Sequence, residues 1–221
     1  MPASPDTEDA RHRLLLTALR LFSQQGFAKT STRELAEAAH VNVASISYYF
    51  GDKAGLYRAA FTDLQSRVQD DVARYSDPAM SLPEALHAYY ATVIDPLREG
   101  DVMRWCMKLF FRELVEPTGL IDELVASEIQ PNHDAMAALL CRHLGLAQAD
   151  DGIHGLCACL AWMGVQLHMG RDINERIAPS TYIGARALDD WHRRLVHYGM
   201  ALIEDERARR QADAPTPGAP A

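Results

Sequence analysis

Apolar residues recur along this chain at spacings of three and four positions, which is the period of one buried face of an α-helix. Five apolar positions follow this period in the first predicted helix, over residues 7–25: Leu14, Leu15, Ala18, Leu19 and Phe22. Gly26 then provides a suitable C-terminal stop. The strand alternation and Asn-Gly turns that indicate hairpins are missing from the sequence. The pattern therefore predicts an all-α fold.

The segment 31–50 predicts two short helices joined by a tight turn. Ser31 and Glu34 have the spacing of a capping box, which would start a helix over residues 32–39. His40 stands in the turn that follows, where histidine tolerates a positive φ better than most other residues do. The small and apolar residues of this stretch are spaced so that the two helices can cross closely.

The second of these helices, over residues 43–49, has Asn42 as a good N-cap. Ile46 and Phe50 are four residues apart and are expected to point inward. The outward side chains are then Val43, Ala44, Ser45, Ser47 and Tyr48. This spacing suits a helix-turn-helix, whose second helix reads the major groove of DNA. The alternative is an ordinary helical hairpin in an all-α core.

Helical periods continue through the rest of the chain. Further helices are predicted over residues 53–75, 83–95, 101–115, 118–144, 151–169 and 180–209. Pro96 is expected to end the second of these helices, and Pro131 to kink or break the fourth. The Pro/Ala-rich residues 212–221 are expected to be disordered.

The composition argues against a membrane protein and against a secreted one. The sequence has no run of about 18 apolar residues that could span a bilayer. Residues 1–9 are polar and acidic, unlike a signal peptide. The cysteines have neither metal-site nor disulfide spacing: Cys106, Cys141, Cys157 and Cys159. We therefore expect a cytoplasmic protein with reduced thiols and no membrane partner.

Charge is divided unevenly along the chain. The net formal charge is −8, yet residues 10–60 carry +4, because seven lysines and arginines stand against three acidic residues. A basic segment on an acidic remainder favours a polyanion bound at one end of the molecule. The charge thus supports a DNA-binding function for the segment 31–50 but does not establish it.

The segment Leu14–Phe61 resembles the DNA-binding head of TetR-family transcriptional regulators. The matching positions are Phe22, Gly26-Phe27, Thr30-Ser31, Glu34-Leu35-Ala36, Val41-Asn42, Tyr48-Tyr49-Phe50, Lys53 and Leu56-Tyr57. The stretches LFFRELVEPT, over residues 109–118, and IQPNHDAMAALLCRHLG, over residues 129–145, resemble the CecR-type subgroup.

These resemblances imply a homodimer that binds a palindromic operator in double-stranded DNA and senses a small molecule through an all-α body. Residues 1–52 are then the helix-turn-helix DNA-binding domain, residues 53–211 the helical ligand-sensing and dimerisation domain, and residues 212–221 a tail. The expected function is a repressor that is released by a small hydrophobic effector.

Ten residues are predicted to contact DNA. Base edges are expected to meet four short side chains: Val43, Ala44, Ser45 and Ser47. Phosphates are expected to meet Thr30, Ser31, Arg33, Tyr48, Tyr49 and Lys53. The tyrosines belong to this set through the resemblance, and Tyr48 is expected to be the exposed one of the pair. Lys53 also stands at the start of its own helix, where the backbone favours a phosphate.

Aromatic and sulfur-containing residues of the body are expected to line an apolar ligand pocket, with polar residues as anchors. The predicted ligand-binding residues are Trp105, Phe110, Arg112, Glu113, Trp162, Met163, Gln166 and His168. The alternative for each residue is ordinary core packing. The acidic body favours a neutral or cationic hydrophobic effector.

Apolar residues of the last two long helices are expected to pair two copies of the chain about a twofold axis. On the first helix they are Ile153, Leu156, Leu160, Gly164, Val165 and His168. On the second they are Leu188, Trp191, Leu195, Tyr198 and Leu202. The alternative is that these residues close the core of a single chain.

A protein–protein adaptor and a metal sensor are the other functions left open. His133, His143, His154 and His168 do not share an i, i+4 spacing, so a metal site would need residues that converge in the folded chain. The sequence has no P-loop, GxSxG motif or nucleotide-binding glycine fingerprint. We therefore expect neither an enzyme nor a cofactor.

Overall fold

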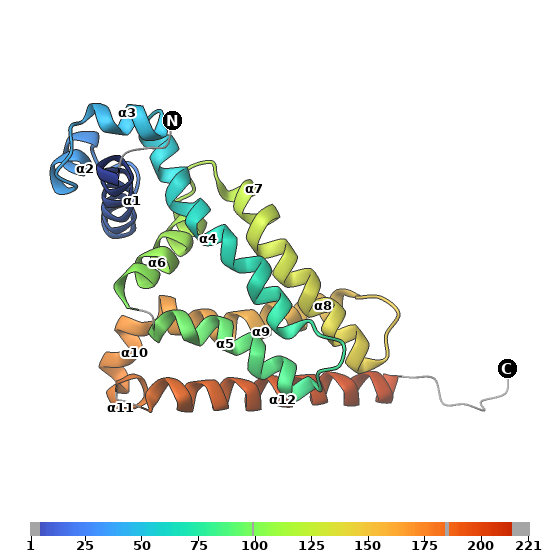
Figure 1. Cartoon of the computed structure of the whole chain (residues 1–221). Helices are drawn as coiled ribbons and strands as arrows, with labels where there is room; N and C mark the ends of the chain where they lie inside the picture. The colour runs from blue at the N-terminus through green and yellow to red at the C-terminus, as the bar shows by residue number, and fades with distance from the viewer. Residues whose placement is uncertain (1–4, 99, 184–185, 214–221) are drawn as a thin grey trace, which may run out of the picture. The chain divides into compact units, whose positions relative to one another are not determined.

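The protein is represented by a computed structural model, and every regular element it describes is a helix (Figure 1), which confirms the predicted all-α class. The described residues are 5–98, 100–183 and 186–213, without the side chains of 5–8, 62–69, 121, 124 and 172. The helices are α1 (Pro5–Gln25), α2 (Thr32–Ala38), α3 (Ala44–Phe50), α4 (Lys53–Tyr75), α5 (Leu82–Arg98), α6 (Asp101–Val115), α7 (Ile121–Leu124), the π-helical η1 (Val125–Ile129), α8 (Gln130–Leu144), α9 (Asp151–Met169), α10 (Arg171–Ile177), α11 (Pro179–Tyr182) and α12 (Ala187–Asp213). None of these helices is long and apolar enough to cross a bilayer.

The chain divides into two compact units. Unit 1 consists of the described residues up to Asp70 together with Asp95–Gln130, and unit 2 of Asp71–Ile94 with the described residues from Pro131 onward. Unit 1 therefore extends well beyond the predicted head. The functional boundaries at residues 52 and 211 stay predictions, and the predicted tail falls outside the described residues from position 214 onward.

Unit 1 has a hydrophobic core shared by the three N-terminal helices, the first part of α4, and α6. Leu15, Leu19, Phe22, Leu35 and Ile46 are buried there, whereas Phe50, which was predicted to point inward, is half-buried. Three residues of α6 belong to the same core: Met103, Cys106 and Leu109. Helix α6, which the sequence assigned to the body, thus packs with the helix-turn-helix.

Short-range hydrogen bonds set the starts of α2 and α3: the capping box of α2 is confirmed, whereas α3 begins at Ala44 with Val43, not Asn42, as its N-cap. Ser31 Oγ accepts a hydrogen bond from the Glu34 backbone N–H at 3.1 Å, and the Glu34 carboxylate accepts from the Ser31 N–H at 3.4 Å. Asn42 Oδ1 accepts from the Ala44 N–H at 2.8 Å. His40 has a φ of 53°, the positive value that its place in the turn suggested.

One of the two prolines differs from its predicted role. Pro96 does not end α5, which continues to Arg98. It lacks the N–H of one helical hydrogen bond, and only two residues of the helix follow it. Pro131 is the second residue of α8 and follows the π-helical turn η1. The helix predicted over residues 118–144 is therefore interrupted directly before Pro131, as expected.

The predicted last helix is wrong at its start, because two short helices precede α12. Pro179 is the first residue of α11, a position that suits proline. Gln166 Oε1 accepts hydrogen bonds from Asn174 Nδ2 and from the Tyr182 hydroxyl, both at 3.2 Å. These bonds hold α10 and α11 to the end of α9. Helices of four and seven residues are too short to show an apolar period.

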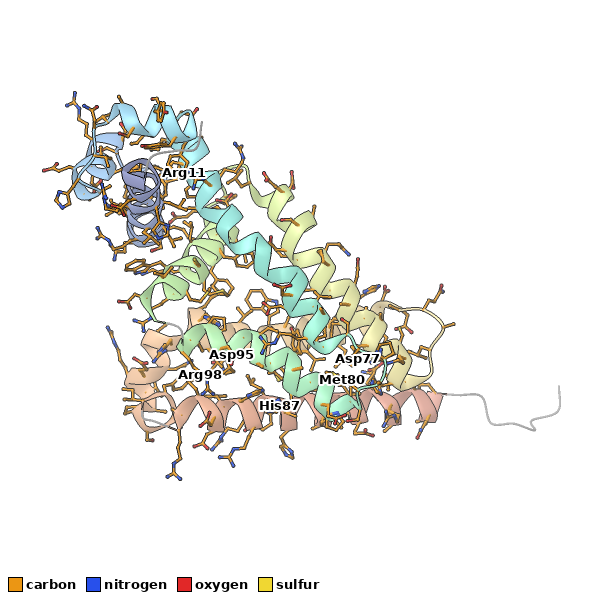
Figure 2. All side chains as sticks on the ribbon, viewed as in Figure 1. Arg11, Asp77, Met80, His87, Asp95 and Arg98 are labelled. Atoms are coloured by element: carbon orange, nitrogen blue, oxygen red, sulfur yellow. The ribbon has the colours of Figure 1, made fainter. Side chains whose placement is uncertain are left out.

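Glycines allow α5, α9 and α12 to pack closely within unit 2, where Figure 1 shows α12 running along the other two. A Cβ atom on Gly164 of α9 would lie 3.0 Å from a methyl group of Val93 on α5. Gly199 of α12 is similarly close to side chains of α5 and α9. His87 on α5 (Figure 2) lies against His192 on α12, with ring centroids 4.1 Å apart.

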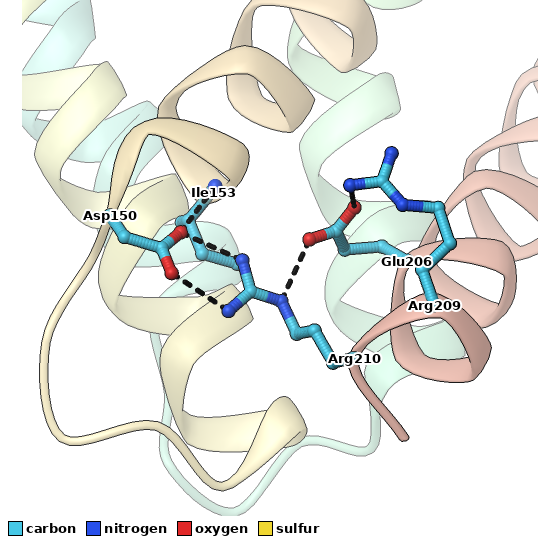
Figure 3. A network of polar contacts seen from close by, with 5 residues as sticks. All are labelled: Asp150, Ile153, Glu206, Arg209 and Arg210. Carbon is cyan, nitrogen blue, oxygen red and sulfur yellow. Dashed lines mark hydrogen bonds and ion pairs between the residues drawn. The ribbon is translucent and has the colours of Figure 1, made fainter. Parts of the chain in front are cut away.

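A charged cluster ties the C-terminal part of α12 to the start of α9 (Figure 3). Asp150 caps α9 by accepting a hydrogen bond from the Ile153 N–H at 3.1 Å. Arg210 donates to both carboxylate oxygens of Asp150, at 2.8 and 2.7 Å, and to Glu206 at 2.7 Å. The hydrogen bonds from Arg210 hold the pKa of Asp150 below its ordinary value. The carboxylate is therefore most stabilising when it is ionised.

We predict that Asp150→Asn destabilises the protein at neutral pH. Asparagine still caps a helix but offers Arg210 one acceptor oxygen instead of two. A lowered folded-state pKa contributes stability above the ordinary aspartate pKa of about 3.9, and that stability is lost as the pH falls further. Urea unfolding measures the free energy of unfolding of the variant and of the wild type. The difference between these two free energies should therefore become smaller below about pH 4.

The matched control is Asp151→Asn, which removes an exposed carboxylate from the first turn of the same helix. Its urea midpoint should change less than that of Asp150→Asn. Equal changes in the two variants, or a gap that does not depend on pH, would contradict the stabilising role of the Asp150–Arg210 pair.

Candidate nucleic-acid interface

Helix α3 leaves most of its surface exposed. Of its seven residues, only Ile46 is buried. Tyr48 is 78% exposed and Tyr49 is half-buried, so Tyr48 is the exposed member of the pair, as predicted. Among the predicted base-contact residues, Val43, Ala44 and Ser47 are exposed and Ser45 is half-buried. The surface that is free to meet a partner therefore consists of short side chains flanked by a tyrosine.

The turn before α3 is fixed by backbone hydrogen bonds to the end of α2. The Val41 N–H donates to the Ala36 carbonyl at 2.9 Å, and the His40 N–H donates to the Glu37 carbonyl at 3.1 Å. Ala36 is buried, which allows the chain to pass close to α2. The direction of α3 therefore depends on α2 and on the left-handed backbone of His40.

Thr30 is a correction to the predicted DNA contacts. Its side chain is 1% exposed, and its hydroxyl donates to the Gly26 carbonyl at 2.7 Å. This bond closes the loop between α1 and α2, so the hydroxyl is directed into the protein rather than toward a phosphate. Ser31 and Arg33, at the same end of α2, are exposed, and their DNA contacts stay predictions.

The ammonium group of Lys53 donates hydrogen bonds to carbonyl oxygens of unit 1. Nζ donates to the carbonyl oxygens of Phe27 and Thr30, at 2.9 Å in both cases. It also lies 4.2 Å from the centroid of the Phe27 ring, a cation–π contact. Two of the three ammonium N–H groups are thus directed into the α1–α2 loop. The predicted contact of Lys53 with a phosphate stays untested.

Arg11 is an exposed cation beside α3 that the sequence did not single out. It lies on α1 (Figure 2), and its guanidinium carbon is 5.2 Å from the centroid of the Phe50 ring, at the end of α3. A positive charge at a helix C-terminus is favourable. The two residues are far apart in the sequence, so no spacing rule could have linked them.

The predicted ligand-binding residues are divided between the two units. Those in unit 1 are Trp105, Phe110, Arg112 and Glu113, and those in unit 2 are Trp162, Met163, Gln166 and His168. In unit 1, Trp105 and Phe110 pack against the core that holds the helix-turn-helix. Arg112 pairs with Glu116 at 3.2 Å, and both side chains lie against Gly26 at the end of α1.

Glu113 is a structural residue, which corrects its prediction as a ligand anchor. Its side chain is fully buried and accepts hydrogen bonds from the Tyr57 hydroxyl at 2.9 Å, the Thr118 N–H at 2.8 Å and the Leu120 N–H at 3.1 Å. Burial, together with the hydrogen bond to Glu113, raises the pKa of Tyr57. The carboxylate thereby joins α4 to the end of α6 and to the segment that follows.

The polar ligand candidates of unit 2 also have partners within the protein. His168 Nε2 lies 2.9 Å from the Val93 carbonyl oxygen, and burial lowers the pKa of His168. Gln166 is bonded to α10 and α11, and Met163 is half-buried. Trp162 is 58% exposed. The role of these residues in ligand binding stays a prediction.

Helix α9 has two apolar faces, and most of the predicted dimer residues lie on the face that is buried within one chain. The buried ones are Ile153, Leu156, Leu160 and Gly164, while Val165 and His168 are half-buried. After the exposed Asp151 and His154 in its first turn, the exposed residues of α9 are small or apolar: Gly155, Ala158, Cys159, Trp162 and Met169. The apolar surface open to a second chain is therefore centred on Trp162.

The predicted dimer stripe of α12 is divided in the same way. Leu195 is buried in the single chain, and Leu188 and Trp191 are half-buried. Tyr198 and Leu202 are exposed. These last two residues retain the predicted position on an open surface.

No three His, Cys, Asp or Glu side chains come together as a metal site among the described residues. His133 Nε2 and His154 Nδ1 do approach each other, at 2.8 Å, with stacked rings. Two imidazoles are fewer than the three or four protein ligands typical of zinc sites.

Comparison with protein families finds matches for both ends of the chain. Residues 14–60 match the family described as "Bacterial regulatory proteins, tetR family". Residues 82–205 match "HTH-type transcriptional dual regulator CecR, C-terminal domain", which covers more than half of the chain.

Individual proteins agree with these matches. The chain is 31% identical to the "Probable HTH-type transcriptional regulator YttP" of Bacillus subtilis (strain 168) over 120 residues, which are 53% of this chain and 56% of that protein. It spans about half the length of the first curated relatives that it matches. The solved structure of HlyIIR, a hemolysin II transcriptional regulator, has a TM-score of 0.62 at 18% identity and covers 87% of this chain and 97% of its own. The SmeT–triclosan complex has a TM-score of 0.63 at 17% identity, with coverages of 87% and 90%.

We predict that Glu113→Ala lowers the free energy of unfolding by about 3 kcal/mol, because it leaves several buried donors without their acceptor. Urea unfolding followed by circular dichroism measures this loss. The control is Glu116→Ala, which removes an exposed carboxylate from the same region and should cost less than about 1 kcal/mol. A loss for Glu113→Ala as small as that of the control would contradict its structural role.

Proposed function

Because the chain belongs to the tetR family of bacterial regulatory proteins and carries a CecR-type C-terminal domain, we propose that it is a repressor that binds a palindromic operator as a homodimer and is released by a small hydrophobic effector. The chain is a DNA-binding transcriptional regulator and not an enzyme. The observation that carries the proposal is the exposed face of α3. Acting on the chromosome, such a regulator works in the cytoplasm.

The proposed base contacts come from α3. Val43 and Ala44 suit thymine methyl groups, and the Ser47 hydroxyl can donate or accept a hydrogen bond. Phosphates on either side would meet Ser31 and Arg33 at the start of α2, and Tyr48, Tyr49 and Arg11 around α3: these residues are exposed or half-buried. The tip of α3 has no Arg or Asn for a bidentate base contact. We therefore expect moderate specificity for each half-site, which dimerisation increases.

The exposed face of α9 supports the homodimer. This helix has no Lys, Arg, Asp or Glu after Asp151, and the described chain buries only one of its faces. A second apolar face on a helix also requires cover. A second copy offers the same surface about Trp162, which is the symmetry of an isologous contact. Tyr198 and Leu202 would add α12 to that interface.

A small-molecule effector is supported by the solved complex of SmeT, a protein of similar fold, with triclosan. The acidic body favours an effector that is neutral or cationic, and the aromatic residues of α6 favour one that is hydrophobic. The CecR-type match refers to a dual regulator, so an assay of regulation should measure activation as well as repression.

The effector would cause release of DNA by moving helices that belong to the core of unit 1. Helix α6 shares that core, and Glu113 of α6 is bonded to Tyr57 of α4. Helix α4 continues from Lys53 to Tyr75 as one helix. We propose that the effector changes the separation of the two α3 helices in the dimer. It can do so only as far as it binds the DNA-incompetent state more tightly.

We predict that the full chain binds duplex DNA from its own upstream region and that Ser47→Glu weakens this binding at least about tenfold. The new carboxylate would face phosphates from an exposed position, so the fold should tolerate it. Fluorescence anisotropy at low ionic strength measures the affinity. Val115→Glu adds the same charge at an exposed site on α6 and should bind as the wild type does. Equal binding by Ser47→Glu and the wild type would contradict the assignment of α3.

We predict that Trp162→Asp converts the dimer to a monomer. Desolvating a carboxylate at the centre of an apolar interface is costly, whereas in a single chain it would remain in water. Sedimentation velocity at micromolar concentration separates the two states, with Val115→Glu as the control that should remain dimeric. A wild type that is monomeric, or a Trp162→Asp variant that stays dimeric, would contradict the proposed interface.

A further inference from the structure

His133 and His154 meet at the surface of unit 2, although they are 21 positions apart in the sequence. His133 belongs to the first turn of α8 and His154 to the first turn of α9. His133 Nε2 lies 2.8 Å from His154 Nδ1, and the two rings are stacked with their planes 17° apart. The His133 side chain is half-buried and that of His154 is exposed, so solutes can reach both rings.

A hydrogen bond between these rings uses one proton, which one nitrogen donates and the other accepts. Such a bond at the surface adds little stability, because water competes for both nitrogens. The outer nitrogens, His133 Nδ1 and His154 Nε2, have no hydrogen-bond partner among the residues that the structure describes. Each neutral ring can therefore carry its proton on the outer nitrogen and direct a lone pair from the inner one.

The separation of the two inner nitrogens matches that of neighbouring ligands on one transition-metal ion. Imidazole nitrogens bind such ions at about 2.0–2.1 Å, so two of them at a right angle lie about 2.8–3.0 Å apart, and two at a tetrahedral angle about 3.3–3.4 Å apart. The observed 2.8 Å fits the right angle. Nitrogen ligands in square-planar or tetragonal geometry are typical of Cu²⁺ and Ni²⁺, whereas zinc prefers the tetrahedron.

Acidic side chains near the pair add an attraction for a divalent cation. Asp134 directly follows His133 in α8. Asp151 stands three residues before His154 in α9, a spacing that places both on one side of the helix. Both aspartates are exposed. Their negative charge favours a cation at the two imidazoles.

A second histidine pair of unit 2 lacks this arrangement. The rings of His87 and His192 are closer, with centroids 4.1 Å apart, but His192 Nε2 lies 2.8 Å from the His87 carbonyl oxygen. That nitrogen is thus directed at the backbone and not at the neighbouring imidazole. Because His87 is exposed as His154 is, it provides a matched control for the loss of one surface histidine.

We propose that His133 and His154 form a binding site for Cu²⁺ or Ni²⁺ that fastens α8 to α9, with water completing the coordination. On binding, the proton shared by the two rings moves to the outer nitrogen of its own imidazole, and each inner nitrogen donates a lone pair to the ion. Cu²⁺ should bind more tightly than Ni²⁺, in the usual order of affinities. The ion joins two helices of one unit, so it should also stabilise the folded chain.

The test is isothermal titration calorimetry of the full chain with Ni²⁺, after any metal has been removed by dialysis against a chelator. The protein carries no affinity tag, and the pH is kept above the ordinary histidine pKa of about 6.5. The variants are His133→Asn and His154→Asn, with His87→Asn as the control. Circular dichroism checks that each variant is folded. Electron paramagnetic resonance of the wild type with Cu²⁺ reports the number of nitrogen ligands without any substitution.

We expect one Ni²⁺ per wild-type chain with a Kd in the micromolar range, binding at least about tenfold weaker for His133→Asn and for His154→Asn, and unchanged binding for His87→Asn. The Cu²⁺ spectrum should show two nitrogen ligands. Equal affinities in the wild type and all three variants would mean that scattered surface histidines bind the ion, which overturns the proposal. Fewer than two nitrogen ligands, or no binding at millimolar Ni²⁺, would also overturn it. DNA binding does not enter these measurements, so they stand apart from the test of the proposed function.

Discussion

A helix of seven residues does not hold its shape in water by itself, since isolated helices shorter than about 12 residues are only marginally stable. Helix α3 has this length and buries one residue, Ile46. Its position must therefore come from its surroundings, namely the hydrogen bond from the Ala44 N–H to Asn42, the left-handed His40 and the core shared with α1 and α6. Because these contacts lie at one side and at one end of the helix, the remaining surface stays available for DNA.

The same dependence connects the DNA-binding helices to the rest of unit 1. Met103, Cys106 and Leu109 of α6 are buried in the core that supports Ile46, and Glu113 of α6 joins Tyr57 of α4 to the chain at Thr118. Close packing transmits displacement, because a packed core has few alternative arrangements. A change in the position of α6 would therefore displace α3, and the effector would not need to contact the DNA-binding helices directly.

Features that depend on neighbouring residues could be predicted from the sequence, and features that depend on distant ones could not. The capping box of Ser31 and the positive φ of His40 follow from rules that act within a few residues. The acceptors of Lys53 and the donors to Glu113 are brought together only by folding. Helix α9 shows a different limit: it has apolar residues on more than one face, so the period could not reveal which face the chain itself buries.

The most direct test of this account is a hydroxyl-radical footprint of the full chain on its upstream DNA at low ionic strength. If two α3 helices enter successive major grooves, the protected sites should form an inverted repeat on one side of the duplex, with centres about 34–36 Å apart or a multiple of that distance. Protection of a single site without an inverted repeat, or no protection, would contradict the claim that a pair of α3 helices reads the DNA.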